Sequence, residues 1–326
     1  MDQRKVRFNQ LLAGAVVAAI CLIGTNCGKQ DASASVHKLR FALPSNDWWT
    51  AAPFIIAKTQ PIFQNHLLDM EFIQVNSGLA SMNAVLAGTA DVGVSAATPL
   101  ALAAARREPI MVLDQYFHSS AVVGLVGPKE SIGSGTPAEP VAIVPSTISE
   151  SFLYSYLEHL GKQGMMERKQ LQELIARPAD VSGDLKTGSA KSAVIWEPFL
   201  SFAAELPGMK ATEGGIDFSV SLLLVARSDI SADRRSDVSR FLEGMRDACD
   251  YITHNPDEAR DLVEKEFSFR ANFLGPVWPR VTYNVQFDAE AIKAEIQREG
   301  RIALALGTIS REPDVSYLLQ GGPSAQ

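Results

Sequence analysis

The chain has 326 residues, 46% of them hydrophobic and 21% charged, with a formal net charge of −7. This acidic balance argues against nucleic acid as a partner, because phosphate backbones are bound by clusters of Lys and Arg. The length is enough for two α/β lobes that each bury their own core.

The first 27 residues have the pattern of a lipoprotein-type signal peptide. Basic residues precede an apolar run over residues 11–23, which is shorter than the about 20 residues of a bilayer span. Cys27 resembles the cysteine that is lipidated in such peptides, and residues 28–37 are expected to form a polar linker. Because Asn26 stands where a small residue is usual, cleavage to a soluble periplasmic form and an uncleaved anchor are the alternatives.

Removal of this segment leaves Cys249 as the one remaining cysteine. No internal disulfide can then form, and Cys249 lies in a helical apolar pattern typical of a small buried residue. The histidines are widely separated in unlike contexts, so no metal-ligand spacing is present. We therefore expect neither a metal nor another cofactor.

Strand and helix patterns alternate along the next part of the chain. The expected strands cover residues 39–43, 70–75, 90–95 and 110–116, and the expected helices cover residues 51–58, 79–87 and 98–107. This order predicts βαβ units and a parallel sheet.

A second α/β set lies between two similar apolar strands, residues 121–127 and 220–226, after which the chain is mainly helical. Its expected strands cover residues 141–144, 171–176 and 193–196, and its expected helices cover residues 149–160 and 181–187. We infer an α/β fold in which one lobe is inserted into the other. Lobe 1 is expected to comprise residues 38–120 and 223–326 and lobe 2 residues 121–222, with two crossing strands as a hinge and a ligand cleft between the lobes.

Short motifs follow one another from about residue 38 to residue 245. The most specific are Gly88-Thr89-Ala90-Asp91-Val92-Gly93 and, later, Trp196-Glu197-Pro198-Phe199; the others are residues 39–41, 54–58, 75–78 and 144–147. Together they resemble the nitrate/sulfonate/taurine-type substrate-binding proteins of ABC importers, whose superfamily includes binders of thiamine-pyrimidine precursors. The loops at residues 44–50 and 131–140 depart from the family pattern and leave the ligand open.

The resemblance implies a type II periplasmic binding protein fold and no enzymatic activity. A small organic anion or a small heteroaromatic compound would be captured by lobe closure and delivered to the permease subunits of an ABC transporter. The protein is then expected to be a monomer, exported to the periplasm or lipid-anchored at the cell membrane. An enzyme or a stand-alone sensor on the same fold is the alternative, although the sequence lacks the usual catalytic motifs.

Ligands of open α/β sheets collect at the carboxyl ends of the strands, where helix N-termini present free N–H groups. Three expected strand-to-helix turns have suitable residues: Ser77 and Gly78; Ala97 and Thr98; and Ser146, Thr147 and Ser149. Their hydroxyls either donate to a bound anion or only cap their own helices.

The loop after the first strand contributes Ser45, Asp47, Trp48 and Trp49 to the expected cleft. Two adjacent Trp residues on a loop are not expected to enter one core, so at least one would stack on the ligand. In the alternative, one indole packs beneath the loop and the other covers the surface.

Glu197 ends an apolar strand and is expected either to recognise an N–H group of the ligand or to cap the following helix. Trp196 is expected in the core of its lobe, and Asp91 at the amino end of its strand in a structural role. His118 lies near the first crossing and is a further candidate ligand contact or a polar hinge residue.

Overall fold

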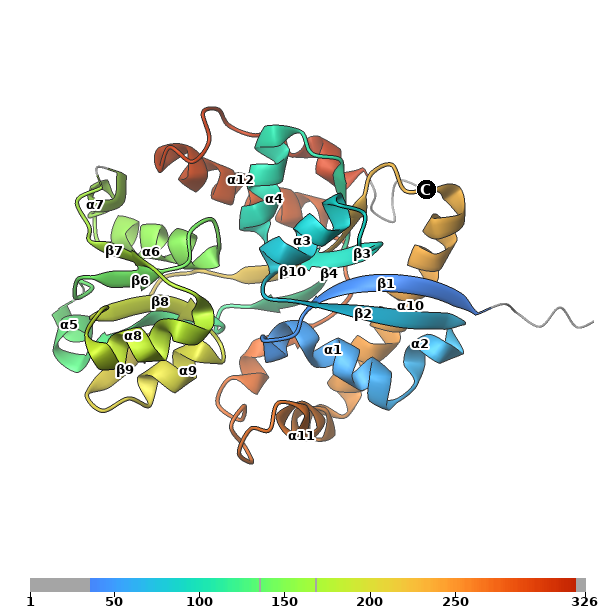
Figure 1. The fold of residues 1–326 in the computed structure, drawn as a ribbon, viewed down its shortest axis with the longest axis horizontal. Coiled ribbons are helices and arrows are strands. Elements are labelled where there is room, and N and C mark those ends of the chain that lie inside the picture. The colour runs from blue at the N-terminus through green and yellow to red at the C-terminus, as the bar shows by residue number, and fades with distance from the viewer. Residues whose placement is uncertain (1–35, 135, 168, 321–326) are drawn as a thin grey trace, which may run out of the picture. The chain divides into compact units, whose positions relative to one another are not determined.

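The computed structural model describes residues 36–134, 136–167 and 169–320. The expected signal peptide, Cys27 and nearly all of the expected linker lie outside these residues. Two β-sheets, each flanked by helices, lie within one compact unit that begins at Val36. We call the part built on the six-stranded sheet lobe 1 and the part built on the five-stranded sheet lobe 2 (Figure 1).

The sheet of lobe 1 is mixed rather than parallel. Its strand order is β11-β4-β10-β3-β1-β2. The strands are β1 (His37–Pro44), β2 (Leu68–Val75), β3 (Val92–Ser95), β4 (Ile110–Ser119), β10 (Val220–Arg227) and β11 (Val281–Tyr283). The expected parallel pairing holds for β1 with β2 and β3, but β10 lies antiparallel between β3 and β4. The expectation of a parallel sheet was wrong at this point because a strand distant in sequence separates two sequential strands.

Lobe 2 repeats this plan on a smaller scale, with the strand order β7-β6-β8-β5-β9. Its strands are β5 (Val123–Pro128), β6 (Val141–Ile143), β7 (Glu173–Ile175), β8 (Ser192–Trp196) and β9 (Met209–Thr212). The strand β6 is parallel to β7 and β8, and β5 is antiparallel to β8 and β9. The strand β9 has no counterpart among the strands expected from the sequence.

The chain passes between the lobes twice. It leaves lobe 1 from β4 into β5 through residues 120–122, and it returns from β9 into β10 through residues 213–219. On the lobe 1 side His118 pairs with Ser221, and on the lobe 2 side Leu125 pairs with Thr212. Paired strands on both sides of two short connections form a suitable hinge.

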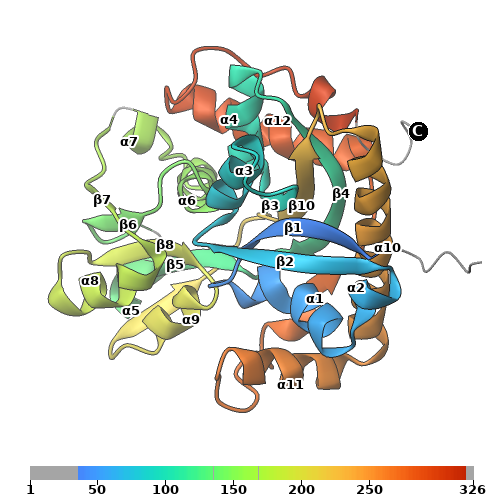
Figure 2. The same ribbon diagram turned by 45° about the vertical axis from the view of Figure 1, so that its right-hand side comes forward.

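Helices cover both sheets (Figures 1 and 2). In lobe 1 they are α1 (Trp48–Thr59), α2 (Ile62–Asn65), α3 (Gly78–Leu86), α4 (Ala97–Arg106), α10 (Ala232–His254), α11 (Pro256–Glu266) and α12 (Ala289–Ala305). In lobe 2 they are α5 (Lys129–Ser134), α6 (Ile148–His159), α7 (Gly164–Glu167), α8 (Val181–Thr187) and α9 (Phe199–Ala204). The 3-10 helices are η1 (Pro178–Asp180), η2 (Trp278–Arg280) and η3 (Ser316–Leu319). None of the helices in the described ranges is long and apolar enough to span a bilayer.

The core of lobe 1 is rich in aromatic side chains. The ring centroids of Phe41 and Phe54 are 4.3 Å apart, and those of Phe63 and Phe241 are 5.7 Å apart. Cys249 on α10 is buried next to this core, as the apolar pattern predicted, and burial raises the pKa of its thiol.

The first helix begins earlier than expected, and this decides where both adjacent Trp residues lie. Trp48 and Trp49 belong to the first turn of α1 instead of a loop, and both are buried. Successive residues of a helix point about 100° apart, so Trp48 packs on Trp278 while Trp49 packs on Phe117. The expectation that two adjacent indoles do not both enter the core was therefore wrong.

Pro53 lies inside α1 and not in its first turn as expected. Because proline has no N–H, the carbonyl of Trp49 loses its helical donor. The hydroxyl of Tyr283 donates to this carbonyl at 3.0 Å, and the hydroxyl of Tyr116 donates to that of Thr50 at 3.0 Å. Two buried tyrosines thus hold the start of α1 in place.

Candidate functional site

A cavity of about 40 Å³ lies where strands from both sheets end and four helices begin. The lining residues are Asp47, Trp49 and Thr50 from the start of α1; Ser77, Gly78 and Leu79 from that of α3; Val94 on β3; Ala96 and Pro99 at α4; Thr147 and Ile148 at α6; Trp196 at the end of β8; and Leu222 on β10. The position agrees with the rule that ligands of α/β sheets bind beyond the carboxyl ends of the strands.

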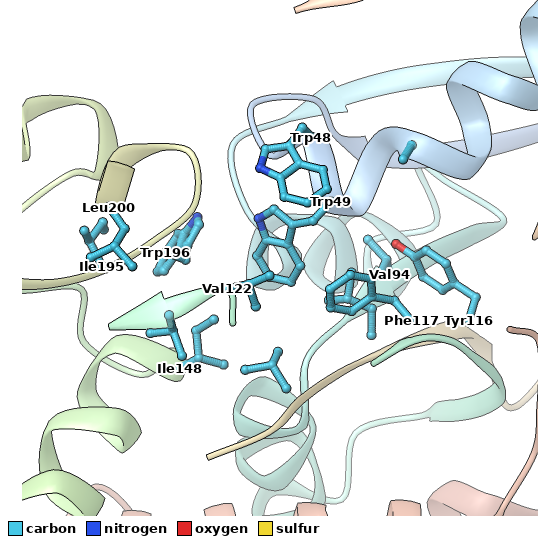
Figure 3. Packing of buried hydrophobic residues seen from close by; sticks show 14 of the residues in the cluster. Trp48, Trp49, Val94, Tyr116, Phe117, Val122, Ile148, Ile195, Trp196 and Leu200 are labelled. Atoms are coloured by element: carbon cyan, nitrogen blue, oxygen red, sulfur yellow. The ribbon is translucent and has the colours of Figure 1, made fainter. Parts of the chain in front are cut away.

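Side chains from the two lobes meet at this cavity. Figure 3 shows Trp49 between Trp196 of lobe 2 on one side and Val94 and Phe117 of lobe 1 on the other. Most of the lining is apolar, which is typical of small-molecule sites with a few polar groups that orient the ligand.

Two hydrogen bonds join the lobes beside the cavity. The indole N–H of Trp49 donates to the main-chain oxygen of Glu197 at 2.9 Å. The indole N–H of Trp196 donates to Oδ1 of Asp47 at 2.9 Å. All four residues are buried, so the lobes are closed on each other here.

Among the described residues, Asp47 is the one acidic or basic side chain on the cavity wall. It precedes α1, where its main-chain oxygen accepts from the N–H groups of Thr50 and Ala51, but its carboxyl group makes no capping bond. Burial raises the pKa of Asp47 to about 7, and the hydrogen bond from Trp196 offsets part of this increase.

Ser77 and Thr147 line the cavity and also cap helices. Oγ of Ser77 accepts from the N–H of Ala80 at 3.2 Å, and Oγ1 of Thr147 accepts from the N–H of Ser149 at 3.2 Å. The hydroxyl of Thr147 in turn donates to the carbonyl of Val144 at 2.7 Å. The capping that the sequence left as an alternative is present at both turns, whereas a ligand contact at either stays a prediction.

Other expected site residues from the helix turns lie away from the cavity lining, with their polar groups bonded elsewhere. The hydroxyl of Thr98 donates to Glu299 of α12 at 2.9 Å, and its neighbour Ala97 is buried in lobe 1. The hydroxyl of Ser149 donates to the carbonyl of Val194 at 2.7 Å and so ties α6 to β8. Ser146 has a φ of 58°, and its N–H donates to the carboxylate of Glu150 at 2.9 Å.

Trp48, Ser45 and His118 also face other surroundings. Trp48 is fully buried against Trp278. Ser45 lines a separate groove of about 370 Å³ on lobe 1. His118 lines a pocket of about 530 Å³ between the crossing strands and α12, where its Nδ1 lies 3.2 Å from Oγ of Ser221. The placement of His118 agrees with a polar hinge residue.

The carboxylate of Glu197 caps a helix. Its oxygens accept from the N–H of Ser201 at 3.2 Å and from the hydroxyl of Ser201 at 2.9 Å. Burial raises the pKa of Glu197 to about 7. Its contribution beside the cavity is the main-chain oxygen that accepts from Trp49.

Asp91 has the structural position that the sequence suggested. Its carboxylate accepts from the main-chain N–H and the guanidinium of Arg40, and it pairs with Arg234 of α10. These cations hold the pKa of Asp91 below its ordinary value although burial opposes them. Asp91 therefore joins β1 and β3 to α10 away from the cavity.

Sequence reasoning missed part of the cavity wall. The missed lining residues are Thr50, Leu79, Val94, Ala96, Pro99, Ile148, Trp196 and Leu222. Most of them lie within two positions of an expected site residue, so extending each expected turn by one helical turn would have found them. Leu222 comes from a crossing strand and had no signal, and Trp196 is buried, as expected, but also lines the cavity. In the described ranges no group of three or more His, Cys, Asp or Glu side chains is arranged to hold a metal ion.

Known proteins share this architecture. One relative is a protein of Brucella abortus (strain 2308) that is named as a binding protein without a stated ligand. It is 24% identical over 224 residues, which is 67% of this chain and 68% of that protein. The periplasmic aliphatic sulphonate binding protein SsuA of Escherichia coli aligns with a TM-score of 0.70 at 15% identity, over 86% of this chain and 91% of that chain. The alkanesulfonate-binding protein SsuA of Xanthomonas axonopodis pv. citri, bound to MOPS, aligns with a TM-score of 0.71 at 12% identity, over 88% and 99% of the two chains.

At these identities the solved structures establish the fold, which is that of periplasmic binding proteins, as the resemblance predicted. The family model described as NMT1/THI5 like matches residues 48–259, which include both crossings and all of the cavity-lining residues except Asp47. The chain therefore belongs to the NMT1/THI5-like family.

Proposed function

We propose that this protein is the solute-binding component of an ABC importer and captures a small molecule between its two lobes. The observation that carries the proposal is the cavity whose wall comes from both lobes at the carboxyl ends of their strands. The paired crossing strands provide a hinge for opening and closing. We propose further that the protein acts as a monomer, without catalysing a reaction.

Lobe closure is the proposed mechanism of capture. A ligand that contacts both lobes stabilises the closed form, and the permease subunits recognise that form. In the closed form the cavity of about 40 Å³ has room for about three water molecules, whereas sites for organic ligands measure about 300–1,000 Å³. An organic ligand therefore enters after the lobes separate, and the lobes close on it with the indoles of Trp49 and Trp196 farther apart.

The proposed ligand classes are a small organic anion and a small heteroaromatic compound. The two sulfonate-binding proteins of the same fold and the four helix N-termini around the cavity support an anion. The two indoles on the cavity wall support a planar ring.

The proposed location is outside the cytoplasm. The signal-like first segment supports export, and the periplasmic location stated for the sulphonate-binding protein of Escherichia coli supports it as well. Lipidation of Cys27 would hold the protein at the membrane next to its permease. Mass spectrometry of the protein from membranes tests this, since an unmodified Cys27 in the mature chain would contradict it.

A thermal-shift screen tests the binding function. Sulfonates, taurine, nitrate, bicarbonate, aminopyrimidines and aromatic acids are added in turn, and a true ligand raises the melting temperature through its preference for the folded state. The ligand is expected to be recovered unchanged, and the radius of gyration in solution scattering is expected to fall when it binds. Chemical conversion of the ligand, or an unchanged scattering profile at saturation, would contradict the proposal.

A pair of variants locates the binding in the cavity. Leu79→Trp adds volume on the cavity wall, whereas Ile175→Trp adds the same ring at a site on β7 that is 76% exposed. The ligand-induced rise in melting temperature is expected to be lost in Leu79→Trp and kept in Ile175→Trp. Equal responses of the two variants would place the binding elsewhere.

A further inference from the structure

The pocket of about 530 Å³ beside His118 is larger than the cavity between the lobes, and we call it the hinge pocket. It lies between the crossing strands β4 and β10 and the helix α12, and sites for small molecules measure about 300–1,000 Å³. Ser221 and Leu222 are adjacent on β10, so their side chains point to opposite faces of the sheet. Ser221 lines the hinge pocket and Leu222 lines the cavity, and the two described linings share no residue.

The wall that α12 gives to the hinge pocket carries guanidinium groups with unused donors. Arg298 is held in place by Glu299, to which its Nε donates at 3.1 Å, and by the carbonyl of Ser219, to which its Nη2 donates at 3.3 Å. None of the described residues accepts a hydrogen bond from its Nη1. Arg301 follows three residues later, is exposed and pairs with none of the described carboxylates. Guanidinium groups with free N–H donors suit a carboxylate, which they can bind through two parallel hydrogen bonds.

The same wall carries carboxyl groups nearer to the start of α12. Glu295 accepts from the main-chain N–H of Ser221 at 3.1 Å, and Asp288 caps α12 by accepting from the N–H of Ala291 at 3.0 Å. Each of these bonds uses one carboxyl oxygen, so acceptor positions remain for the N–H groups of a bound ammonium. Burial raises the pKa of Glu295, and a cationic ammonium group beside it would favour its ionised form.

This arrangement of charges favours a zwitterion over a simple ion. The carboxyl groups oppose a simple anion in the hinge pocket, and the guanidinium groups oppose a simple cation. Glu295 and Arg298 are three residues apart, so they are neighbours on one face of α12 and about 4.5 Å apart along its axis. The ammonium and the carboxylate of an α-amino acid are joined through one carbon atom and can therefore contact such a pair of side chains at the same time.

We propose that the hinge pocket binds a polar α-amino acid, whose ammonium group lies at Glu295 and whose carboxylate lies at Arg298 and Arg301. The carboxamide groups of Gln115 and Gln286 also line the pocket and offer hydrogen bonds to a polar side chain of the ligand. The proposed site is separate from the cavity between the lobes, so it does not depend on the solute that the cavity holds.

L-Glutamine and two analogues that each lack one charge test the proposal. Glutaramate lacks the ammonium group, and γ-aminobutyramide lacks the carboxylate. Dissociation constants for the purified protein are measured by isothermal titration calorimetry and by ligand-observed NMR. L-Glutamine is expected to bind at least about tenfold more tightly than either analogue, since each charged group adds a charge-assisted hydrogen bond. An analogue that binds as tightly as L-glutamine, or the absence of L-glutamine binding, would overturn the proposal.

Two variants assign the charges of the ligand to the wall of the hinge pocket. Arg301→Gln is expected to weaken L-glutamine binding by about tenfold and to leave the binding of γ-aminobutyramide unchanged. Glu295→Gln keeps an acceptor for Ser221 and is expected to weaken L-glutamine binding while leaving that of glutaramate unchanged. The control is Arg311→Gln, which alters an exposed arginine outside the lining and is expected to keep the wild-type affinity.

Equal affinities of Arg301→Gln and Arg311→Gln for L-glutamine would contradict the assigned carboxylate position. Because Arg301 is exposed, its variant decides the matter if Glu295→Gln does not fold.

The variant Leu79→Trp separates the hinge pocket from the cavity between the lobes. It is expected to bind L-glutamine as the wild type does, because Leu79 lines the cavity and not the hinge pocket. Loss of L-glutamine binding in Leu79→Trp, with normal binding in Arg301→Gln, would overturn the proposal and would support the binding function of the cavity. Normal binding in Leu79→Trp, with a loss of about tenfold in Arg301→Gln, would support the hinge site whatever ligand the cavity takes.

Discussion

Two regions hold the lobes together, and they differ in burial and in chemistry. Beside the cavity, the contacts are the buried hydrogen bonds from Trp49 to Glu197 and from Trp196 to Asp47. The second region, which we call the rim, is formed by Phe269, Arg270, Phe273 and Arg280 of the segment after α11 and by the residues that they contact. Phe269 and Phe273 contact Phe202 of α9, with ring centroids 6.1 Å and 5.5 Å apart. Arg270 pairs there with Glu205, and Arg280 pairs with Glu213.

The difference shows which contacts control closure. A buried donor or acceptor that loses its partner costs about 1–3 kcal/mol, because water does not replace the partner. An exposed ion pair contributes about 0–1 kcal/mol and is screened by salt. The hydrogen bonds beside the cavity are therefore expected to contribute most of the free energy that stabilises the closed lobes. The ion pairs at the rim are expected to contribute less, and their contribution depends on the salt concentration.

The largest expected difference between the two regions is in their response to pH. Burial raises the pKa of Asp47 and of Glu197 to about 7, and the unfolded chain has values near 4. Between these values the folded protein holds protons that the unfolded chain has released, so stability falls as the pH rises from about 4 to about 7. Asp47 alone is expected to lower the free energy of unfolding by roughly 2 kcal/mol between pH 5 and pH 7.

Denaturant unfolding of the wild type and of Asp47→Asn over this pH range checks the expectation. The variant is expected to show a flatter dependence, because Asn does not titrate. If the free energy of unfolding changes equally with pH in the two proteins, then the pKa of Asp47 is not raised by folding, and Asp47 does not cause the pH dependence.

A comparison of two tryptophans tests the cost of an unpaired buried group. Trp196→Phe removes the donor to Asp47, whereas Trp48→Phe removes a buried indole N–H that has no hydrogen-bond partner among the described residues. Both variants lose a similar volume. Trp196→Phe is therefore expected to lower the free energy of unfolding by about 2 kcal/mol more than Trp48→Phe. Equal losses in denaturant titrations would mean that the Trp196 hydrogen bond does not stabilise the closed lobes.

The aromatic contact at the rim is expected to have a smaller effect. Phe202 is 38% exposed, so Phe202→Ala removes only part of an aromatic burial and is expected to cost about 1 kcal/mol. Ile175→Ala, at a more exposed site of the same lobe, is the control and is expected to change stability by less than about 0.5 kcal/mol. If Phe202→Ala lowers the free energy of unfolding by more than about 2 kcal/mol, the rim stabilises the closed lobes as strongly as we expect the hydrogen bonds beside the cavity to do.

The ion pairs at the rim are expected to have the smallest effect. Arg270→Gln removes an exposed pair with lobe 2, and Arg280→Gln removes an exposed pair with Glu213 of the second connection. Each variant is expected to cost at most about 0.5 kcal/mol at low salt. The difference from the wild type is expected to vanish near 1 M salt, where the screening length is about 3 Å. A cost that persists in high salt would indicate that these arginines act through packing.

Much of the element order could be predicted from the sequence because it depends on local patterns. The helix at Val181–Thr187 has the bounds that were expected for it, and β1 and β10 lie within one or two residues of the expected strands. The start of α1 was placed three residues late because Pro53 was taken for a first-turn residue. The carbonyl of Trp49, which Pro53 leaves without a helical donor, accepts instead from Tyr283, a residue 234 positions away.

The candidate site was predictable at the level of turns but not of side chains. Sequence position placed Asp47, Ser77 and Thr147 near the ends of strands, and all three line the cavity. The sequence did not show that Thr98 and Ser149 turn to partners on other elements, because Glu299 and Val194 are 201 and 45 residues away.

The sequence by itself determined the family, the α/β order and the two passages of the chain between the lobes, since each depends on short motifs and hydrophobic periodicity. The tertiary structure decided that β10 lies between β3 and β4, that Trp49 and not Trp48 reaches the cavity, and that Asp47 is the one acidic or basic wall residue in the part of the chain that the structure describes. Burial and hydrogen-bond partners depend on residues that folding brings together from distant parts of the chain, so they are properties of the folded molecule.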